Sequence, residues 1–333
     1  MSAIENREQW LAGRRQGIGG SDIAAILGLS PYRTAVDVWL DKRGLAEELE
    51  ENEAMYWGIT LEEVVSKEFQ IRNNTKVQRV NRILQHEANP WMQANIDRIV
   101  WEGNAMPVNS FTGELRSKHL LECKTAGAFV AHRWGNDEDT LPLEYTCQAM
   151  WYLAVTGADI CDVACLIGGQ KYIQRRIVRD DAVIASMIES ARVFWFDHVQ
   201  TGIAPEPVNG DDVAKLFKQD NGTSIQANEE MLMCIDRLTA LKAELKTLEN
   251  EEEELQDALK IKLGEASNIE YNGSTLVTWR KSSDSNKTNW KEAAASIKKW
   301  VLELGITEGD NSVSEIINTY TKTQSGSRRF LIK

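Results

Sequence analysis

The period of the hydrophobic positions changes several times along the chain, and each change predicts a different kind of element. As far as residue 74, apolar residues recur every three or four positions, which is the spacing of one face of a helix. This part predicts helices at residues 5–12, between Ser21 and Pro31, at 34–45 and at 52–74. Ser21 or Asp22 is the expected N-cap of the second helix, and Pro31 ends it.

Beyond residue 74 the pattern becomes strand-like, with short apolar runs and alternation. The runs lie at residues 75–81, 82–86, 91–101 and 118–124, with a polar insertion at 103–117. A helix over 141–157 then precedes a β-hairpin of residues 161–169 and 171–178 and an amphipathic helix at 180–202. This order of helices, sheet, helix, hairpin and helix predicts an α/β core of roughly 200 residues.

The character of the chain changes after residue 204, so we predict a core domain at 1–204 and a C-terminal α+β extension at 205–333. Residues 228–263 predict one long charged helix, whose leucines follow a heptad pattern that Glu252 interrupts. We expect this helix to fold back on its own domain rather than to form a free coiled coil. A β-hairpin around an Asn-Gly turn, a helix at 288–303 and a final strand at 327–333 complete the extension.

The composition is that of an ordinary globular protein, because 42% of the 333 residues are hydrophobic and 26% are charged. We expect no membrane span and no signal peptide, since no apolar run is long enough for either. The five cysteines form no paired framework, which favours a reducing cytoplasm. The net charge of −12 argues against coating nucleic acid by bulk charge, but it leaves room for a local basic channel.

Residues 120–126, LLECKTA, place an acid and a lysine on one face of a predicted strand. Side chains alternate along a strand, so Glu122 and Lys124 lie side by side at the end of an apolar run. Asp97 follows apolar residues in an earlier strand, and Asp…Glu-x-Lys is the arrangement of metal-dependent nucleases. Two carboxylates hold a divalent ion that acidifies water, while the lysine orients or deprotonates that water and stabilises the anionic transition state. The plainer alternative is an ion pair at a strand end.

Two further polar residues are candidates for the same site. Glu62 lies on the helix before the sheet, where it would add a third carboxylate, but helical spacing does not separate it from Glu63. Gln148 lies on the helix after the Glu-x-Lys strand, and it is equally well explained as a polar position of an amphipathic helix. Spacing alone therefore leaves both assignments open.

Taken together, these motifs resemble the YqaJ-type viral recombinase family, which is similar to lambda exonuclease within the PD-(D/E)XK nuclease superfamily. The resemblance covers about residues 8–200, in consistent order. It is carried by IGGSDIAAILGLSPYRTAVDVWLDKRG, WGITLEEVV, NIDRIV, LLECKT and the pattern Y-x-x-Q-x-x-x-Y-x-x-V-T-G. It implies a restriction-endonuclease-like core, in which helices flank a central mixed sheet.

The resemblance assigns the site residues by matching positions. Asp97, Glu122 and Lys124 match the metal and catalytic positions, and Gln148 matches the glutamine of the following helix. Glu62 matches the acid after Trp-Gly, which favours it over its neighbour as the third metal ligand. Two features depart from the pattern, because isoleucine replaces the usual proline before Asp97 and the gap of 122 − 97 = 25 positions is long.

A second group of residues matches positions that meet a terminal 5′ phosphate. These are Arg14 and Ser21, with Arg33 as a weaker candidate for the same pocket. An arginine, a hydroxyl and the amides of a helix N-terminus together suit an anion. Ser21 is also explained as a simple helix cap, and the two roles are compatible.

The resemblance implies a Mg²⁺-dependent 5′→3′ exonuclease, with Mn²⁺ as a substitute ion, that resects linear double-stranded DNA for a single-strand annealing protein. It also implies a homo-oligomeric ring, a trimer, and a phage or prophage origin in the cytoplasm of a bacterial host. A structure-specific or phage-type endonuclease on the same core is the alternative within this class. A catalytically inert docking module is the alternative from another class, and the ordered set Glu62, Asp97, Glu122 and Lys124 argues against it.

Overall fold

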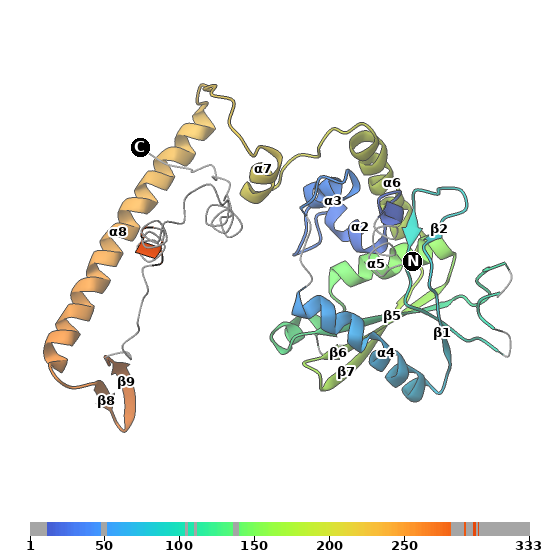
Figure 1. Cartoon of the computed structure of the whole chain (residues 1–333), viewed down its shortest axis with the longest axis horizontal. Helices are drawn as coiled ribbons and strands as arrows, with labels where there is room; N and C mark the ends of the chain where they lie inside the picture. The colour runs from blue at the N-terminus through green and yellow to red at the C-terminus, as the bar shows by residue number, and fades with distance from the viewer. Residues whose placement is uncertain are drawn as a thin grey trace. The chain divides into compact units, whose positions relative to one another are not determined.

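The computed structural model describes residues 12–47, 52–103, 106–109, 112–135 and 140–280, and the single residues 290, 296, 297 and 299. The chain forms two compact units, Met1–Phe217 and Lys218–Lys333 (Figure 1). The predicted strand at 327–333 lies outside the described residues. The same is true of the predicted helix at 5–12, except for its last residue, and of most of the predicted helix at 288–303.

The first unit is built on a five-stranded sheet with the order β1-β4-β5-β6-β7. Its strands are Val77–Arg79 (β1), Arg98–Val100 (β4), His119–Ala126 (β5), Ile160–Ile167 (β6) and Lys171–Val178 (β7). β5 and β6 run parallel, and the other neighbouring pairs are antiparallel. The parallel pair follows from its connection, because an intervening helix carries the chain back along the sheet. The predicted mixed sheet is confirmed.

Helices cover both faces of this sheet, as the predicted core requires (Figure 1). On one face lies α4 (Glu53–Asn73), whose Val65 and Phe69 pack in one apolar cluster with Leu121 of β5. The other face carries a larger apolar cluster, which includes Leu120 of β5. Its helices are α2 (Gly20–Ile26), α3 (Ala35–Lys42), α5 (Leu143–Thr156), α6 (Asp181–Val193) and the π-helical continuation of α6, η2 (Phe194–Gln200).

This division of the strand residues determines where the candidate acid and lysine point. Successive side chains of a strand lie on opposite faces, so Glu122 and Lys124 share the face of Leu120. That face is the one that α2 and α5 cover. The Glu-x-Lys pair therefore projects toward these two helices and away from α4.

The strand predicted at 91–101 is interrupted in the structure. Its first part is β3 (Gln93–Ala94), which pairs with β2 (Leu84–Gln85), and its last part is β4. Residues 95–97 belong to neither strand, so Asp97 lies in the irregular segment just before β4. The insertion at 103–117 folds partly on itself through a bridge between Val108 and Leu115.

The first unit continues beyond residue 204, where the sequence suggested a boundary. α7 (Gly210–Leu216) is tied to α3 through the hydroxyl of Thr34, which donates to the buried carboxylate of Asp212 over 2.7 Å. Lys215 of α7 also pairs with Asp37 of α3 at 2.5 Å. These are contacts between residues far apart in the sequence, which a change in composition does not reveal. They keep α7 in the first unit.

The second unit contains the predicted long helix as α8 (Glu229–Leu263). The predicted hairpin follows as β8 (Asn268–Tyr271) and β9 (Ser274–Thr278), with positive φ at Asn272 and Gly273, as a tight hairpin turn requires. The heptad leucines at 241, 245, 248, 255 and 259 are exposed. The expectation that α8 folds back on its own domain stays a prediction, because most residues after 280 lie outside the described part of the chain. None of the described helices has both the length and the apolar character needed to cross a membrane.

Candidate active site

β5 presents the Glu-x-Lys pair at the edge of the larger apolar cluster. Leu120 and Leu121 are buried on opposite faces and hold the strand in the sheet. Glu122 is also buried, with 4% of its surface exposed, whereas Lys124 is partly exposed. The Lys124 ammonium donates to Glu122 Oε1 over 2.6 Å. The pair predicted from the strand period is therefore formed.

Gln148 of α5 connects these two charged groups. Its Nε2 donates to Glu122 Oε1 over 2.7 Å, and its Oε1 accepts from Lys124 Nζ over 3.0 Å. The same Nε2 lies 2.8 Å from the hydroxyl of Tyr152, one turn further along α5. Gln148 is buried, so the amide is fixed by these contacts and in turn fixes the acid and the lysine. Its predicted place beside Glu122 and Lys124 is the observed one.

Two tyrosines of α5, Tyr145 and Tyr152, complete this network. The sequence analysis did not assign either of them to the site. Tyr145 places its ring 5.0 Å from Lys124 Nζ, a distance suited to a cation–π contact. Tyr145, Gln148 and Tyr152 have the spacing i, i+3, i+7, which puts them on one face of a helix. The pattern Y-x-x-Q-x-x-x-Y in the sequence carried this signal.

Asp97 reaches the site from the segment before β4. Its Oδ2 accepts the backbone N–H of Cys123, in β5, over 2.8 Å. Burial and then the Glu122 carboxylate raise the pKa of Asp97 well above its usual value, and the nearby Lys124 ammonium only partly opposes this. Burial alone would lower the pKa of Lys124, but Glu122 and Asp97 outweigh it and raise that pKa. The site therefore concentrates negative charge around a single ammonium group.

The donor atoms at this point suit a hard divalent cation. Glu122 Oε2 is buried and has no hydrogen-bond partner among the described residues, while its other oxygen is fully used by Lys124 and Gln148. A buried carboxylate oxygen without a partner is costly unless a ligand satisfies it. A metal ion held by Glu122 and Asp97 would satisfy that oxygen and neutralise the excess charge. The residues present fit such an ion.

Glu62, the third predicted metal ligand, is engaged elsewhere. Its Oε1 forms ion pairs with Arg98 at 2.5 Å and with Arg79 at 3.2 Å. Arg98 is almost wholly buried and also binds Glu63 at 2.9 Å, so one arginine holds the two adjacent acids Glu62 and Glu63. The described residues contain no group of three or more His, Cys, Asp or Glu side chains placed to share a metal ion. Glu62 lies close enough to raise the pKa of Asp97, but not in one ligand set with it.

The predicted phosphate-binding residues gather around a buried acid, Asp22. Its carboxylate pairs with Lys42 at 2.7 Å, with Arg33 at 3.3 Å and with Arg14 at 3.8 Å. Burial would raise the pKa of Asp22, but Lys42 and the two arginines outweigh it and lower the pKa to about 2. Arg14 also donates to the hydroxyl of Ser21 over 3.4 Å. Three cations thus surround one buried carboxylate, and Arg33 also pairs with Asp41 at 3.5 Å.

One cavity of about 200 Å³ joins the two groups. Asp97, Glu122 and Gln148 line one part of it, and Arg14 and Ser21 line another. Lys42, which the sequence reading missed, also lines the cavity; its only signal was a lysine on the buried side of a short helix. Arg33 supports Asp22 but does not line the cavity. Among the predicted residues, Asp97, Glu122, Gln148, Arg14 and Ser21 line this cavity. Lys124 contacts it through Glu122 and Gln148, and Glu62 and Arg33 do not line it.

The comparisons with known proteins identify the family of the chain. A sequence model of the YqaJ-like viral recombinase domain matches residues 9–159. The uncharacterized protein YqaJ of Bacillus subtilis is 34% identical over 270 residues, which are 78% of this chain and 79% of that protein. Among solved structures, an alkaline exonuclease from Laribacter hongkongensis has a TM-score of 0.47 at 22% identity, over 59% of this chain and 94% of its own. A phage related exonuclease from Haemophilus somnus has a TM-score of 0.40 at 11% identity, over 56% of this chain and 96% of its own.

Proposed function

Because the chain belongs to the family of YqaJ-like viral recombinases, we propose that it is a metal-dependent exonuclease that degrades double-stranded DNA from its ends in the 5′→3′ direction. The observation that carries this proposal is one cavity lined by two groups of residues. The acids Asp97 and Glu122 line one part, next to Lys124, and form the acid–lysine site with it. Arg14, Ser21 and Lys42 line another part, which we call the cationic pocket. A strand whose 5′ phosphate lies in the cationic pocket would present its next phosphodiester bond to the acids. Such a site selects a strand end, as an exonuclease must.

Each residue of the acid–lysine site has a distinct task in this reaction. Asp97 and Glu122 would hold Mg²⁺, with Mn²⁺ as a substitute, and this ion supplies a Lewis acid and lowers the pKa of bound water. The Lys124 ammonium orients the attacking water and stabilises the negative charge of the transition state. Gln148 holds Lys124 and Glu122 in register through its two amide contacts. Tyr152 steadies the amide in turn.

The cationic pocket binds the terminal phosphate. Arg14, Ser21 and Lys42 line the cavity there and supply the charged and hydroxyl donors that a phosphate prefers. The amides at the start of α2 add to this site. Arg33 does not line the cavity and acts indirectly, because it pairs with Asp22, the acid that Arg14 and Lys42 also contact.

The biological role that fits this activity is resection of linear DNA for a single-strand annealing protein during phage-type recombination. A ring of identical subunits, a trimer, would bring basic residues to face the duplex although the net charge of the chain is −12. Such a ring would also keep one DNA end enclosed through many cycles of cleavage. Both the partner and the ring belong to the proposal.

The test is a digestion with Mg²⁺ of matched linear and covalently closed circular duplexes, the linear one labelled at either end. We expect loss of the linear DNA alone, with the 5′ label released first as nucleotides. Cleavage of the circle would favour a structure-specific endonuclease on the same core, and no cleavage would favour the inert docking module. Chelation of the metal should stop the digestion without unfolding the protein, because the proposed ion is catalytic rather than structural.

A further inference from the structure

A second cavity is lined by the two residues that follow Lys124 in β5, Thr125 and Ala126. It measures about 140 Å³ and is bounded by the end of β5, by the 3₁₀ helix η1 (Ala128–Trp134) and by the start of α5. Tyr145 lines it, and the same tyrosine ring lies 5.0 Å from Lys124 Nζ. Lys124 lines neither cavity, but it contacts Glu122 and Gln148 of the first and Tyr145 of the second. The proposed function uses only the first cavity.

An exposed but restrained tyrosine forms the mouth of the second cavity. Tyr32 has 66% of its surface exposed, yet its hydroxyl accepts a hydrogen bond of 2.9 Å from Arg133. Arg133 is held in turn by the buried carboxylate of Glu144 at 2.8 Å. The backbone N–H of Tyr32 also donates to the side chain of Ser30 over 3.2 Å. Because this ring is fixed before any ligand arrives, a flat partner can stack on it at little cost in conformational entropy.

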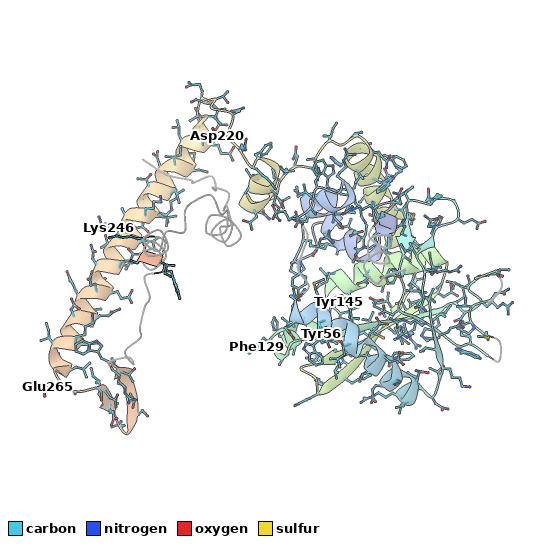
Figure 2. The ribbon with its side chains drawn as sticks, viewed as in Figure 1. Tyr56, Phe129, Tyr145, Asp220, Lys246 and Glu265 are labelled. Carbon is cyan, nitrogen blue, oxygen red and sulfur yellow. The ribbon has the colours of Figure 1, made fainter. Side chains whose placement is uncertain are left out.

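The remaining lining combines aromatic and apolar side chains with Thr125 and Arg133. Trp134 is buried, and its ring lies 5.4 Å from that of Tyr145, which fixes the inner wall. Val130 and Pro142 also line the cavity. Phe129, beside Val130 on η1, has 97% of its surface exposed and projects from the body of the first unit (Figure 2). A flat, aromatic ligand suits such walls better than a charged one.

We propose that the second cavity binds the base of the nucleotide immediately 3′ of the cleaved bond, with Tyr32 as its stacking platform. This inference rests on the proposed function, in which the 5′ phosphate lies beside Arg14 and the cleaved bond beside Lys124. A strand that follows this path continues past Lys124 toward Tyr145 and the second cavity. The base found there is unpaired, because a stacked and paired base does not fit between protein rings.

The path of the strand is also consistent with the chain connections. Tyr32 and Arg33 are neighbours in the segment between α2 and α3, and Arg33 binds the acid of the cationic pocket at 3.3 Å. One short segment therefore supports both ends of the path. Stacking on Tyr32 would offset the cost of opening the duplex end, and so couple the opening to correct placement of the bond at Lys124.

The experiment measures binding of fluorescent, 5′-phosphorylated single strands in the presence of chelator, which prevents cleavage. One strand is intact, one lacks the base of its second nucleotide, and one lacks a base near its 3′ end. We expect the wild type to bind the second strand about tenfold more weakly than the first, and the third as tightly as the first. Tyr32→Ala should bind the intact strand about tenfold more weakly, with no further loss when the second base is missing.

Matched variants separate a lost platform from a damaged fold. Tyr271→Ala removes a tyrosine of similar exposure, 67%, from β8 of the second unit, and it should behave as the wild type. Tyr32→Phe keeps the ring and loses the hydrogen bond to Arg133, so it should retain sensitivity to the second base. A merely structural role of Tyr32 would weaken binding of all three strands equally and would overturn the proposal.

The outcomes also distinguish this inference from the function on which it rests. If the wild type digests linear DNA with Mg²⁺ but ignores the loss of the second base, the proposed function stands and the base site is wrong. Independent, additive losses from Tyr32→Ala and from the missing base would contradict it as well. If the wild type neither binds nor cleaves DNA, both proposals fall together.

Discussion

One amide, that of Gln148, connects the two charged groups of β5 on which catalysis is proposed to depend. Because Lys124 donates to both Glu122 and Gln148, its ammonium is fixed in direction as well as in charge. One oxygen of Glu122, Oε1, accepts from Lys124 and Gln148. The other, Oε2, has no hydrogen-bond partner among the described residues. At this scale the site is a set of fixed donors on one side and an open carboxylate oxygen on the other.

Lys124→Ala removes the ammonium that is expected to stabilise the transition state. The rate of DNA cleavage should fall at least about a hundredfold, which is typical for the loss of such a donor, while DNA binding is retained. Cleavage and binding are compared in parallel, by gel digestion and by fluorescence anisotropy. Lys171→Ala, at the exposed start of β7, is the control and should cleave normally. Full activity of Lys124→Ala would refute the assignment.

Arg14→Ala removes one of the donors of the cationic pocket. We expect the preference for 5′-phosphorylated over 5′-hydroxyl ends to drop about tenfold, because one charge-assisted hydrogen bond is lost. The measurement is the ratio of digestion rates on the two ends. Arg15→Ala provides a neighbouring exposed arginine that does not line the cavity, and it should leave the ratio unchanged. A wild type that digests both ends equally would show that the pocket has another role.

At the scale of elements, Asp22 ties α2 to the rest of the first unit. It lies in the first turn of α2 and accepts the backbone N–H of Gly19 over 2.9 Å, which caps the helix. The same carboxylate receives Lys42 from the end of α3. The buried carboxylate of Asp22 thus connects the N-terminal cap of α2 to the last turn of α3. Arg14 and Lys42 of the cationic pocket both contact this carboxylate.

Asp22→Asn should destabilise the fold in a pH-dependent manner. Folding lowers the pKa of Asp22 from its usual 3.8 to about 2, so its contribution is present above pH 4 and is lost as pH falls toward 2. A shift of this size corresponds to about 2 kcal/mol. We expect urea unfolding to show that the variant's free energy of unfolding is lower than that of the wild type by at least about 2 kcal/mol at pH 7. This difference in unfolding free energy should become smaller between pH 4 and pH 2.

The control for this prediction is Asp181→Asn, which removes a mostly exposed acid that pairs with Arg179. Exposed ion pairs contribute little, so this variant should be nearly as stable as the wild type at every pH. If the difference in unfolding free energy between Asp22→Asn and the wild type stays constant across the pH range, the lowered pKa assigned to Asp22 is contradicted.

At the scale of the whole molecule, the first unit carries the active-site cavity, the second cavity and the sheet between its helices. Nearly all the buried hydrophobic residues described lie in it. A chain ending at Phe217 should therefore fold on its own, because more than 200 residues suffice for a full core. Calorimetry should show a single cooperative transition and near-ultraviolet circular dichroism a fixed tryptophan environment. A broad, non-cooperative transition would show that residues after 217 complete the fold.

The sequence by itself determined the parts of this protein that depend on local periodicity. The two-residue repeat of a strand places Glu122 and Lys124 on one face, and the structure has them there. Helical spacing also places Gln148 on the same face of α5 as Tyr145 and Tyr152, although the sequence analysis assigned neither tyrosine to the site. These features follow from neighbours within a few positions, so they need no knowledge of the fold.

Only the tertiary structure decided which distant charges meet. Asp97 reaches Cys123 because the predicted strand breaks before β4, and Glu62 pairs with Arg98 because both lie where α4 crosses the sheet. Lys42 and Arg14 converge on Asp22 from different helices, and α7 joins the first unit through Asp212. The physical reason is that a buried charge takes whichever opposite charge the packing brings within reach, and spacing along the chain does not fix that partner.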